Sequence, residues 1–223
     1  MSFPFDASTY RTCSRRRVVF ARGGMVCSSQ PLAAQAGLDV LRRGGNAVDA
    51  AIATAAALTV VEPTSNGVGG DAFAQIWMDG RLYGLNSSGP ACALADADYL
   101  RSHFGAVPEE GWYSVNVPGI PAAWAEASRK FGRLPFPELF TSAISYAEGG
   151  YPVAPVVAEL WREDFRRFHP LRNEQVFKPW FESFAPEGAP PKAGETVLLP
   201  HLADTLRELA AGGCESFYRG ELA

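Results

Sequence analysis

The sequence has few residues that could hold a metal ion or a disulfide framework. It has four cysteines, Cys13, Cys27, Cys92 and Cys214, and three histidines, His103, His169 and His201. None of them falls into the short paired spacings of zinc ligands, and widely scattered cysteines are typical of reduced thiols. We therefore predict no metal site and no cofactor.

Basic runs and long apolar runs are also scarce. The net charge is −4 and the main basic block is residues 15–17, whereas nucleic-acid binding needs a basic face or stripe. The longest low-polarity run, residues 50–61, is shorter than the roughly 20 residues that cross a membrane. No apolar core of the kind found in a secretion signal follows the arginines. We expect no nucleic-acid partner, no membrane partner and a cytoplasmic location.

The composition is that of an ordinary globular protein, with 47% hydrophobic and 20% charged residues. Residues 1–17 are polar and irregular, and the pattern after them predicts short strands at 17–20 and 24–28. We assign residues 1–22 to an N-terminal arm with a first strand, and residues 23–223 to one main region.

Two adjoining helices are predicted next. The first begins near Pro31 with Ser29 in the region of its N-cap, and Gly44 and Gly45 end it. Asn46 can cap the second helix, and the carboxylate of Asp49 favours its N-terminal dipole. Residues 50–61 are small or apolar on every side of this helix, so we predict that it is buried all round.

A β-hairpin and further helices follow. Strands at 72–78 and 81–85 flank Asp79–Gly80, a residue pair that favours a two-residue turn. Helical spacing recurs at about 95–103, 121–131, 137–148, 154–168 and 201–211, and the proline-rich stretch 184–195 predicts a surface loop. The fold class predicted from these elements is α/β.

Two loops are candidates for a site. Residues 67–71 are rich in glycine, but the loop leads from a helix into a strand, opposite to a nucleotide-binding loop. A tight backbone crossing or a plain turn explains it better. Asn86, Ser87 and Ser88 follow the second hairpin strand and are candidate substrate-binding residues, with a local side-chain turn as the alternative. They lack the setting of a serine nucleophile. The residues alone therefore indicate no catalytic set.

The order of several motifs carries more information than any one of them. The motifs are SQPLA at 29–33, LRRGGNAVDAA at 41–51, VVEP at 60–63, GVGGDAF at 67–73, VPG at 117–119, KAGE at 192–195 and FYRG at 217–220. Taken together they resemble the start of the γ-glutamyltranspeptidase family. The GGNAVDAA segment is the most specific of them.

The resemblance implies a precursor with an αββα N-terminal-nucleophile hydrolase sandwich that cuts itself into a large and a small subunit. The N-terminal threonine of the small subunit attacks a γ-glutamyl amide, as in glutathione, with its own α-amino group as base. Residues 23–223 correspond to the first part of the large subunit, incomplete at its C-terminal end and containing a helical cluster. The resemblance therefore implies no catalytic residue in this chain, no activity of the chain alone, and two partners: the small-subunit half and a small amide substrate.

One position departs from the transpeptidase pattern. In that family an arginine in an Arg-Glu-x-Ala-Pro motif grips the substrate α-carboxylate, and here either Ser88 or Asn86 occupies its place, depending on the alignment. Neither can replace the charged, bidentate contact of arginine. The Asn-x-Ser-Gly sequence instead resembles acylase-like members, although Pro90 replaces their usual arginine. The alternatives are thus a relative that cleaves another amide, or a non-catalytic binding or scaffold module.

Overall fold

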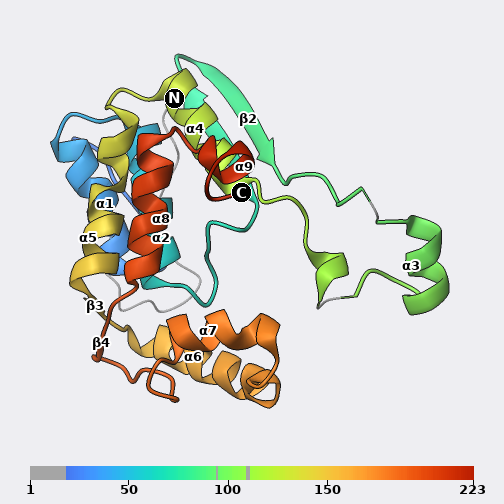
Figure 1. The fold of residues 1–223 in the computed structure, drawn as a ribbon. Coiled ribbons are helices and arrows are strands. Elements are labelled where there is room, and N and C mark those ends of the chain that lie inside the picture. The colour runs from blue at the N-terminus through green and yellow to red at the C-terminus, as the bar shows by residue number, and fades with distance from the viewer. Residues whose placement is uncertain (1–18, 94, 109–110) are drawn as a thin grey trace, which may run out of the picture.

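The computed structural model describes residues 19–93, 95–108 and 111–223, and this part of the chain is mostly helical (Figure 1). Its α-helices are α1 (Pro31–Arg42), α2 (Ala47–Val61), α3 (Ala97–Phe104), α4 (Ile120–Phe131), α5 (Thr141–Gly149), α6 (Pro155–Phe168), α7 (Lys178–Phe184), α8 (Pro200–Ala211) and α9 (Ser216–Arg219). The strands are β1 (Ala72–Met78), β2 (Arg81–Ser87), β3 (Tyr151–Pro152) and β4 (Thr196–Val197). Helices α1, α2, α5 and α8 form the main body, while α3 projects from it on a long arm.

The sequence predicts the cap of α2 correctly and misplaces that of α1 by one residue. Asn46 caps α2 as predicted: its Oδ1 accepts hydrogen bonds from the backbone N–H of Val48 and Asp49, and Asp49 Oδ2 accepts from the backbone N–H of Asn46. The N-cap of α1 is Gln30 rather than Ser29. The hydroxyl of Ser29 instead donates to Glu62 at 2.7 Å, which ties the start of α1 to the end of α2.

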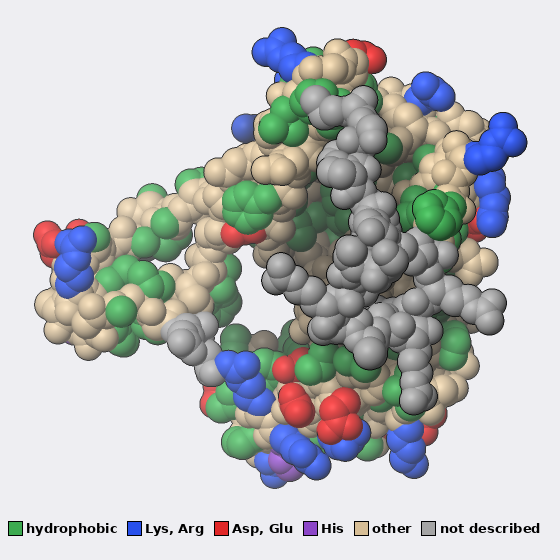
Figure 2. Space-filling model, turned by 180° about the vertical axis from the view of Figure 1, so that it is seen from behind, with side chains coloured by type: hydrophobic (Ala, Val, Ile, Leu, Met, Phe, Trp, Pro, Cys, Tyr) green, Lys and Arg blue, Asp and Glu red, His purple; other side chains and the backbone are tan. Residues whose placement is uncertain are grey.

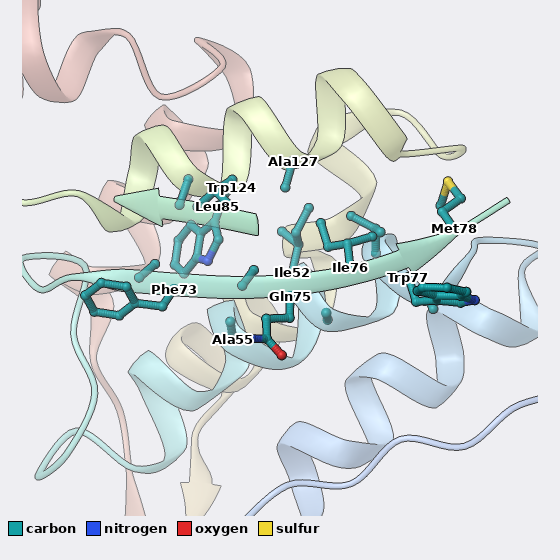
Figure 3. A pocket seen from close by; sticks show the side chains of 16 residues that line it. Ile52, Ala55, Phe73, Gln75, Ile76, Trp77, Met78, Leu85, Trp124 and Ala127 are labelled. Carbon is teal, nitrogen blue, oxygen red and sulfur yellow. The ribbon is translucent and has the colours of Figure 1, made fainter. Parts of the chain in front are cut away.

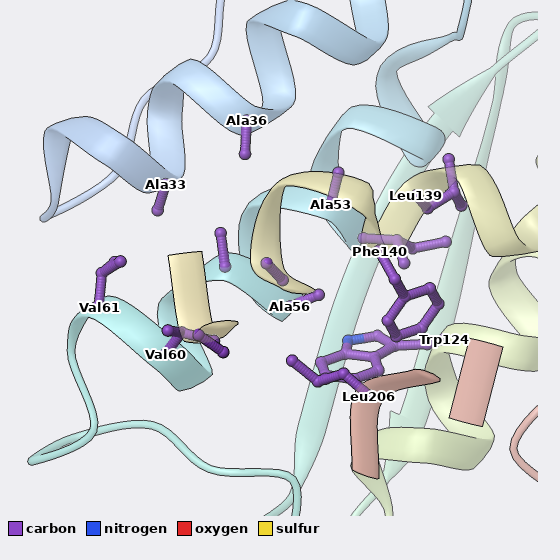
Figure 4. Packing of buried hydrophobic residues seen from close by; sticks show 14 of the residues in the cluster. Ala33, Ala36, Ala53, Ala56, Val60, Val61, Trp124, Leu139, Phe140 and Leu206 are labelled. Atoms are coloured by element: carbon purple, nitrogen blue, oxygen red, sulfur yellow. The ribbon is translucent and has the colours of Figure 1, made fainter. Parts of the chain in front are cut away.

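Small residues bring α1 and α2 together. Ala33 and Ala36 of α1 point toward α2, which carries small residues such as Ala53 and Ala56, and all four are at most 1% exposed (Figure 4). Alanine at these positions lets the two helix backbones approach closely without a loss of packing density. The other side of α2 packs on larger side chains of the helices that follow, among them Leu139, Phe140, Trp124 and Leu206.

The prediction that α2 is buried all round is wrong on one face. Ala51 is exposed, and Ala55 and Leu58 are only partly buried. They line hollows on either side of the helix that no described residue fills. An apolar helix face open to water is unfavourable, because burial of such surface contributes about 25 cal/mol per Å². This open face of α2 is therefore a surface suited to packing against a further structural element.

The hairpin is confirmed, and it is longer than predicted. Asp79 and Gly80 both take positive φ, 51° and 76°, as the mirror-image two-residue turn requires. The antiparallel ladder runs from Met78–Arg81 to Ala72–Ser87, so that Asn86 and Ser87 belong to β2 rather than to the loop after it. One face of the hairpin packs on α4, and the other exposes Phe73, Trp77 and Leu82.

Most later helices are confirmed, and α7 is an addition. Phe165, Phe168 and Trp161 of α6 meet an aromatic set on and before α7, which comprises Phe177, Trp180, Phe181 and Phe184. Of the three α6 aromatics only Trp161 is fully buried. The surface loop is confirmed for residues 185–195, which contain no helix or strand.

One expectation about strands is wrong in the described residues, and another is met only in part. Residues 19–28 form no strand, because no neighbouring segment pairs with their backbone; residues 1–18, which include Arg17 and Val18, lie outside the described residues. The described part of the chain also contains no layered sheet, only two sheets of two strands each. A sandwich needs long-range strand pairing that these residues do not supply. Within the described ranges, no helix is long and apolar enough to cross a membrane.

Candidate functional site

The three candidate residues lie where the end of β2 crosses the chain that returns from the arm. Ala91 and Asn116 form an isolated antiparallel bridge, and the N–H of Val117 donates to the carbonyl of Pro90 at 2.9 Å. The arm therefore leaves the body after Pro90 and rejoins it at Asn116. The VPG motif of the sequence, residues 117–119, packs directly on the loop that contains Ser88.

Two glycines make this crossing possible. A Cβ atom on Gly89 would overlap the carbonyl oxygen of Val117, and a Cβ atom on Gly119 would overlap that of Ser87. Gly89 also has a positive φ of 53°, a backbone conformation that favours glycine. The tight backbone crossing thus occurs here. The loop 67–71 also contacts this crossing, since the carbonyl of Gly70 accepts from the N–H groups of Gly119 and Ile120.

The side chains of the three candidates are used differently. Asn86 is exposed, and its Oδ1 accepts from the N–H of Ser88 at 3.1 Å, which leaves the amide NH₂ open to solvent. The hydroxyl of Ser87 points inward and donates to the carbonyl of Gly119 at 2.8 Å. The hydroxyl of Ser88 has no hydrogen-bond partner among the described residues. Asn86 and Ser88 therefore carry the polar groups that remain available.

Asn116 joins three segments at this point. Its Nδ2 donates to the backbone carbonyl of Ser88 at 2.6 Å and to the carboxylate of Asp71 at 3.1 Å. The amide has two N–H groups, so both hydrogen bonds can form at once. The end of the glycine-rich loop, the candidate site loop and the root of the arm are thereby fixed to one side chain.

Tyr218 holds the other end of the VPG turn. Its hydroxyl donates to the carbonyl of Pro118 at 2.7 Å and accepts from the backbone N–H of Ala122 at 3.2 Å. Ala122 lies in the first turn of α4, where backbone N–H groups lack helical partners. Burial raises the pKa of Tyr218, although the hydrogen bond from Ala122 opposes this shift. The phenol is therefore neutral and able to donate at physiological pH.

A groove of about 380 Å³ runs along the free edge of β1, between this strand and the open face of α2 (Figure 3). Ala51 and Ala55 line its helical side, and Phe73, Ile76 and Met78 are among the strand residues along it. The groove is apolar, with Gln75 as its polar side chain. Phe73 pairs with Asn86 in the ladder, so the candidate loop lies across the hairpin from one end of the groove.

The described residues contain no cluster of three metal-ligating side chains. The cysteine with a resolved pKa shift is Cys214, whose burial raises the thiol pKa to about 12 and makes it unreactive at neutral pH. The site can therefore bind and orient a polar group, but the described residues next to it supply no activated nucleophile.

The sequence pattern predicts Asn86, Ser87 and Ser88 as candidate substrate-binding residues. It does not predict that Asn116 and Tyr218 hold the loop on which these candidates lie. Both lie in or next to motifs of the sequence, VPG and FYRG. The separation between Tyr218 and Pro118, 100 residues, leaves no local pattern from which their hydrogen bond could be predicted.

Solved structures define the class of this fold. A cephalosporin acylase from Bacillus halodurans is 51% identical and superposes with a TM-score of 0.88 over 98% of this chain and 41% of its own. The helical body with its hairpin is thus a portion of the fold shared by acylases and transpeptidases. Residues 33–223 match the gamma-glutamyltranspeptidase family, and the chain belongs to that family.

Sequence relatives agree with this assignment. A glutathione hydrolase proenzyme from Bacillus subtilis (strain 168) is 32% identical over 216 residues, which cover 93% of this chain and 35% of the relative. An oxamate amidohydrolase proenzyme from Klebsiella pneumoniae is 37% identical over 212 residues, which cover 90% of this chain and 38% of the relative. The chain thus spans little more than a third of the length of these relatives.

Proposed function

We propose that this chain is the first part of the large subunit of an amide hydrolase that reacts through an acyl-enzyme on a threonine outside these 223 residues. The family supports the reaction type, and the relatives named above carry it out on different amides. Within this reaction the chain binds and orients the acyl group, since it holds the candidate loop and its described residues contain no nucleophile with a base.

The loop Asn86–Pro90 favours an acyl group without a γ-glutamyl α-carboxylate. The segment contains no charged residue, and the free groups on it are the amide of Asn86 and the hydroxyl of Ser88. Neutral donors form weaker hydrogen bonds to a carboxylate than a bidentate arginine does. We therefore propose an acylase-like substrate, and 51% identity to a cephalosporin acylase supports this choice. Cleavage of a γ-glutamyl amide is the second candidate, favoured by the glutathione hydrolase relatives.

The open surfaces support the existence of a second half. Within the described residues one edge of β1 pairs with no strand and offers unpaired backbone groups, and the outer hairpin face exposes Phe73, Trp77 and Leu82 at 70%, 65% and 57%. An exposed edge strand beside an apolar face is a strong site for further strand pairing. We propose that the small-subunit half of the precursor supplies these strands and completes the αββα sandwich.

Three 4-nitroanilides test the substrate on the complete precursor. γ-Glutamyl, glutaryl and butyryl anilides differ stepwise, because glutaryl lacks the α-amino group and butyryl lacks the carboxylate as well. We expect the γ-glutamyl compound to have a kcat/KM no higher than the other two. A preference of more than about 100-fold for γ-glutamyl, worth ~2.7 kcal/mol of transition-state binding, would contradict the acylase-like proposal and favour the second candidate.

Two further samples complete the experiment. Ser88→Arg places a cation at the position of the transpeptidase arginine and should raise hydrolysis of the γ-glutamyl anilide relative to the butyryl anilide. The 223-residue chain alone should hydrolyse none of the three. If the chain alone releases nitroaniline above the blank, the assignment of the nucleophile to a later segment is wrong.

A further inference from the structure

The root of the arm and the candidate site loop are one connected unit. The described residues of the arm, 92–93, 95–108 and 111–115, include α3 and stand clear of the body (Figures 1 and 2). Its two ends are joined by the bridge between Ala91 and Asn116 and by the hydrogen bond from Val117 to Pro90. The loop that contains Asn86 and Ser88 lies directly before this junction, so whatever fixes the junction also fixes the loop.

Few contacts other than these junction contacts can hold the loop in place. Ser88 is partly buried, Gly89 and Pro90 are exposed, and the loop after them leads into the arm. The arm gives little support, because its aromatic side chains mainly contact one another: Tyr99 stacks on His103 and lies near Tyr113. A loop with few buried contacts opens at low free energy unless hydrogen bonds close it.

Two side chains supply those hydrogen bonds from opposite sides. Asn116 binds the backbone carbonyl of Ser88 and the carboxylate of Asp71. Tyr218 binds the carbonyl of Pro118 and the N–H of Ala122, and thereby fixes the residue before Gly119. Gly119 in turn accepts the hydroxyl of Ser87. An unbroken chain of contacts thus joins Tyr218 to the site loop.

We propose that Asn116 and Tyr218 are positioning residues that set the place of the Asn86–Ser88 loop. This inference rests on the proposed function for the role of the loop, but the coupling itself is a property of the structure. Neither residue needs to touch the substrate. Each acts through backbone groups, so that its loss displaces the amide of Asn86 and the hydroxyl of Ser88 together.

Hydrogen exchange of the 223-residue chain tests the coupling without any enzyme assay. Tyr218→Phe keeps the ring and removes both hydrogen bonds. Loss of these bonds should speed exchange of the N–H groups of Ser88, Val117 and Gly119 by about ten-fold, equivalent to ~1.4 kcal/mol of local stability. Exchange in α1 and α2, which lie away from Tyr218, should stay within about two-fold of the parent.

Tyr83→Phe is the matched control, because it makes the same chemical change in the hairpin strand that leads to the site loop. The ring of Tyr83 packs on Phe131, and its hydroxyl has no hydrogen-bond partner in the described ranges. It should leave exchange at Ser88 and Val117 unchanged. If Tyr218→Phe speeds exchange only within α4, or speeds it equally everywhere, Tyr218 supports the fold and does not position the loop.

Two variants at Asn116, one single and one double, separate the position of the loop from the stability of the chain. Asn116→Asp loses the donor to Ser88 and places a second carboxylate beside Asp71. The double variant Asn116→Asp with Asp71→Asn restores a donor between these two residues but not the hydrogen bond to Ser88. We expect the double variant to recover the thermal midpoint, while hydrogen exchange at the N–H of Ser88 stays fast. Recovery of both would overturn the role of the Ser88 contact.

In the complete precursor the same variants report on the substrate. Tyr218→Phe and Asn116→Asp should raise KM for the preferred anilide by about five-fold and leave kcat within about two-fold, as expected for lost binding of the acyl group. If both variants instead lower kcat and leave KM unchanged, the positioning role is overturned. Absence of hydrolysis by the parent would refute the proposed function, whereas hydrogen exchange still decides the coupling.

Discussion

The carboxylate of Asp49 accepts the backbone N–H of Arg133 with both of its oxygens, at 3.1 and 3.0 Å, although the two residues are 84 positions apart. The same carboxylate accepts from Asn46 and Leu134 and is fully buried. It thus closes the N-terminus of α2 and the turn after α4 at once. The cap residue Asn46 strengthens this junction by donating from Nδ2 to the carbonyl of Phe131 at 2.6 Å.

Replacement of Asp49 should therefore cost more than the loss of a helix cap. Asp49→Ala removes the acceptor of the N–H groups of Asn46, Arg133 and Leu134, and we expect a loss of about 3 kcal/mol in the free energy of unfolding. Asp49→Asn keeps the shape but loses one acceptor oxygen, so a smaller loss of about 2 kcal/mol follows. Urea denaturation measures both. A loss near 1 kcal/mol for Asp49→Ala is typical of a helix cap alone. It would contradict the role of Asp49 in joining α2 to the turn after α4.

At Gly37 helix α1 lies close against α2. A Cβ atom there would overlap the hydroxyl of Thr54 and lie 3.0 Å from the carbonyl of Ala50. Gly37→Ala should destabilise the chain by about 1–3 kcal/mol, because the helices must separate. Gly149→Ala is the control, since the added Cβ meets nothing within 4 Å. Thermal unfolding should show a lower midpoint for the first variant alone, and equal midpoints would be evidence against close packing at Gly37.

Buried Cys214 should make stability depend on pH in the alkaline range. Burial raises the pKa of this thiol from 9.0 to about 12. Between these values the unfolded chain releases the proton and the folded chain keeps it, so the stabilisation present below pH 9 is lost as the pH rises toward 12. The free energy of unfolding should therefore fall more steeply above pH 9 in the parent than in Cys214→Ala. Parallel curves would mean that the thiol titrates normally in the folded chain.

The outer face of the hairpin should drive self-association of the isolated chain. Trp77 and Leu82 pair across the strands and are mostly exposed. Apolar side chains beside a free strand edge favour pairing between molecules. The double variant Trp77→Thr with Leu82→Thr should lower the fraction of oligomers in sedimentation velocity without lowering the thermal midpoint.

Val156→Thr provides the comparison for this surface. Val156 is 72% exposed on α6, away from the hairpin. It should leave the oligomer fraction as in the parent. An equal reduction by both substitutions would show that general hydrophobicity, and not the hairpin face, causes the association.

Local chemistry allowed much of the fold to be predicted. The Asp79–Gly80 turn, the cap at Asn46 and the helical spacing of residues 120–168 depend on neighbours within a few positions. The site was predicted less completely. Asn86, Ser87 and Ser88 were candidates because they follow a strand, but the inward direction of the Ser87 hydroxyl depends on Gly119, 32 residues later. The substrate role of these three residues stays a prediction.

The failures share one physical cause. The strand expected at 24–28 is absent, and the described residues supply only two small sheets toward the expected αββα sandwich. Strand pairing needs partners distant in sequence, which local periodicity does not encode. The open face of α2 at Ala51 is a further case, because the apolar pattern of residues 50–61 shows that the helix is suited to burial but not which element covers it.

Residue type and short spacing were enough to predict the cap at Asn46, the Asp79–Gly80 turn and the family to which the order of motifs assigns the chain. The packed structure was needed to show that Asp49 joins α2 to the turn after α4, that Tyr218 holds the VPG turn, and that one edge of β1 is unpaired within the described residues. The first two are contacts between segments about 80 to 100 residues apart, and the free energy that selects them comes from packing and buried hydrogen bonds in the assembled fold.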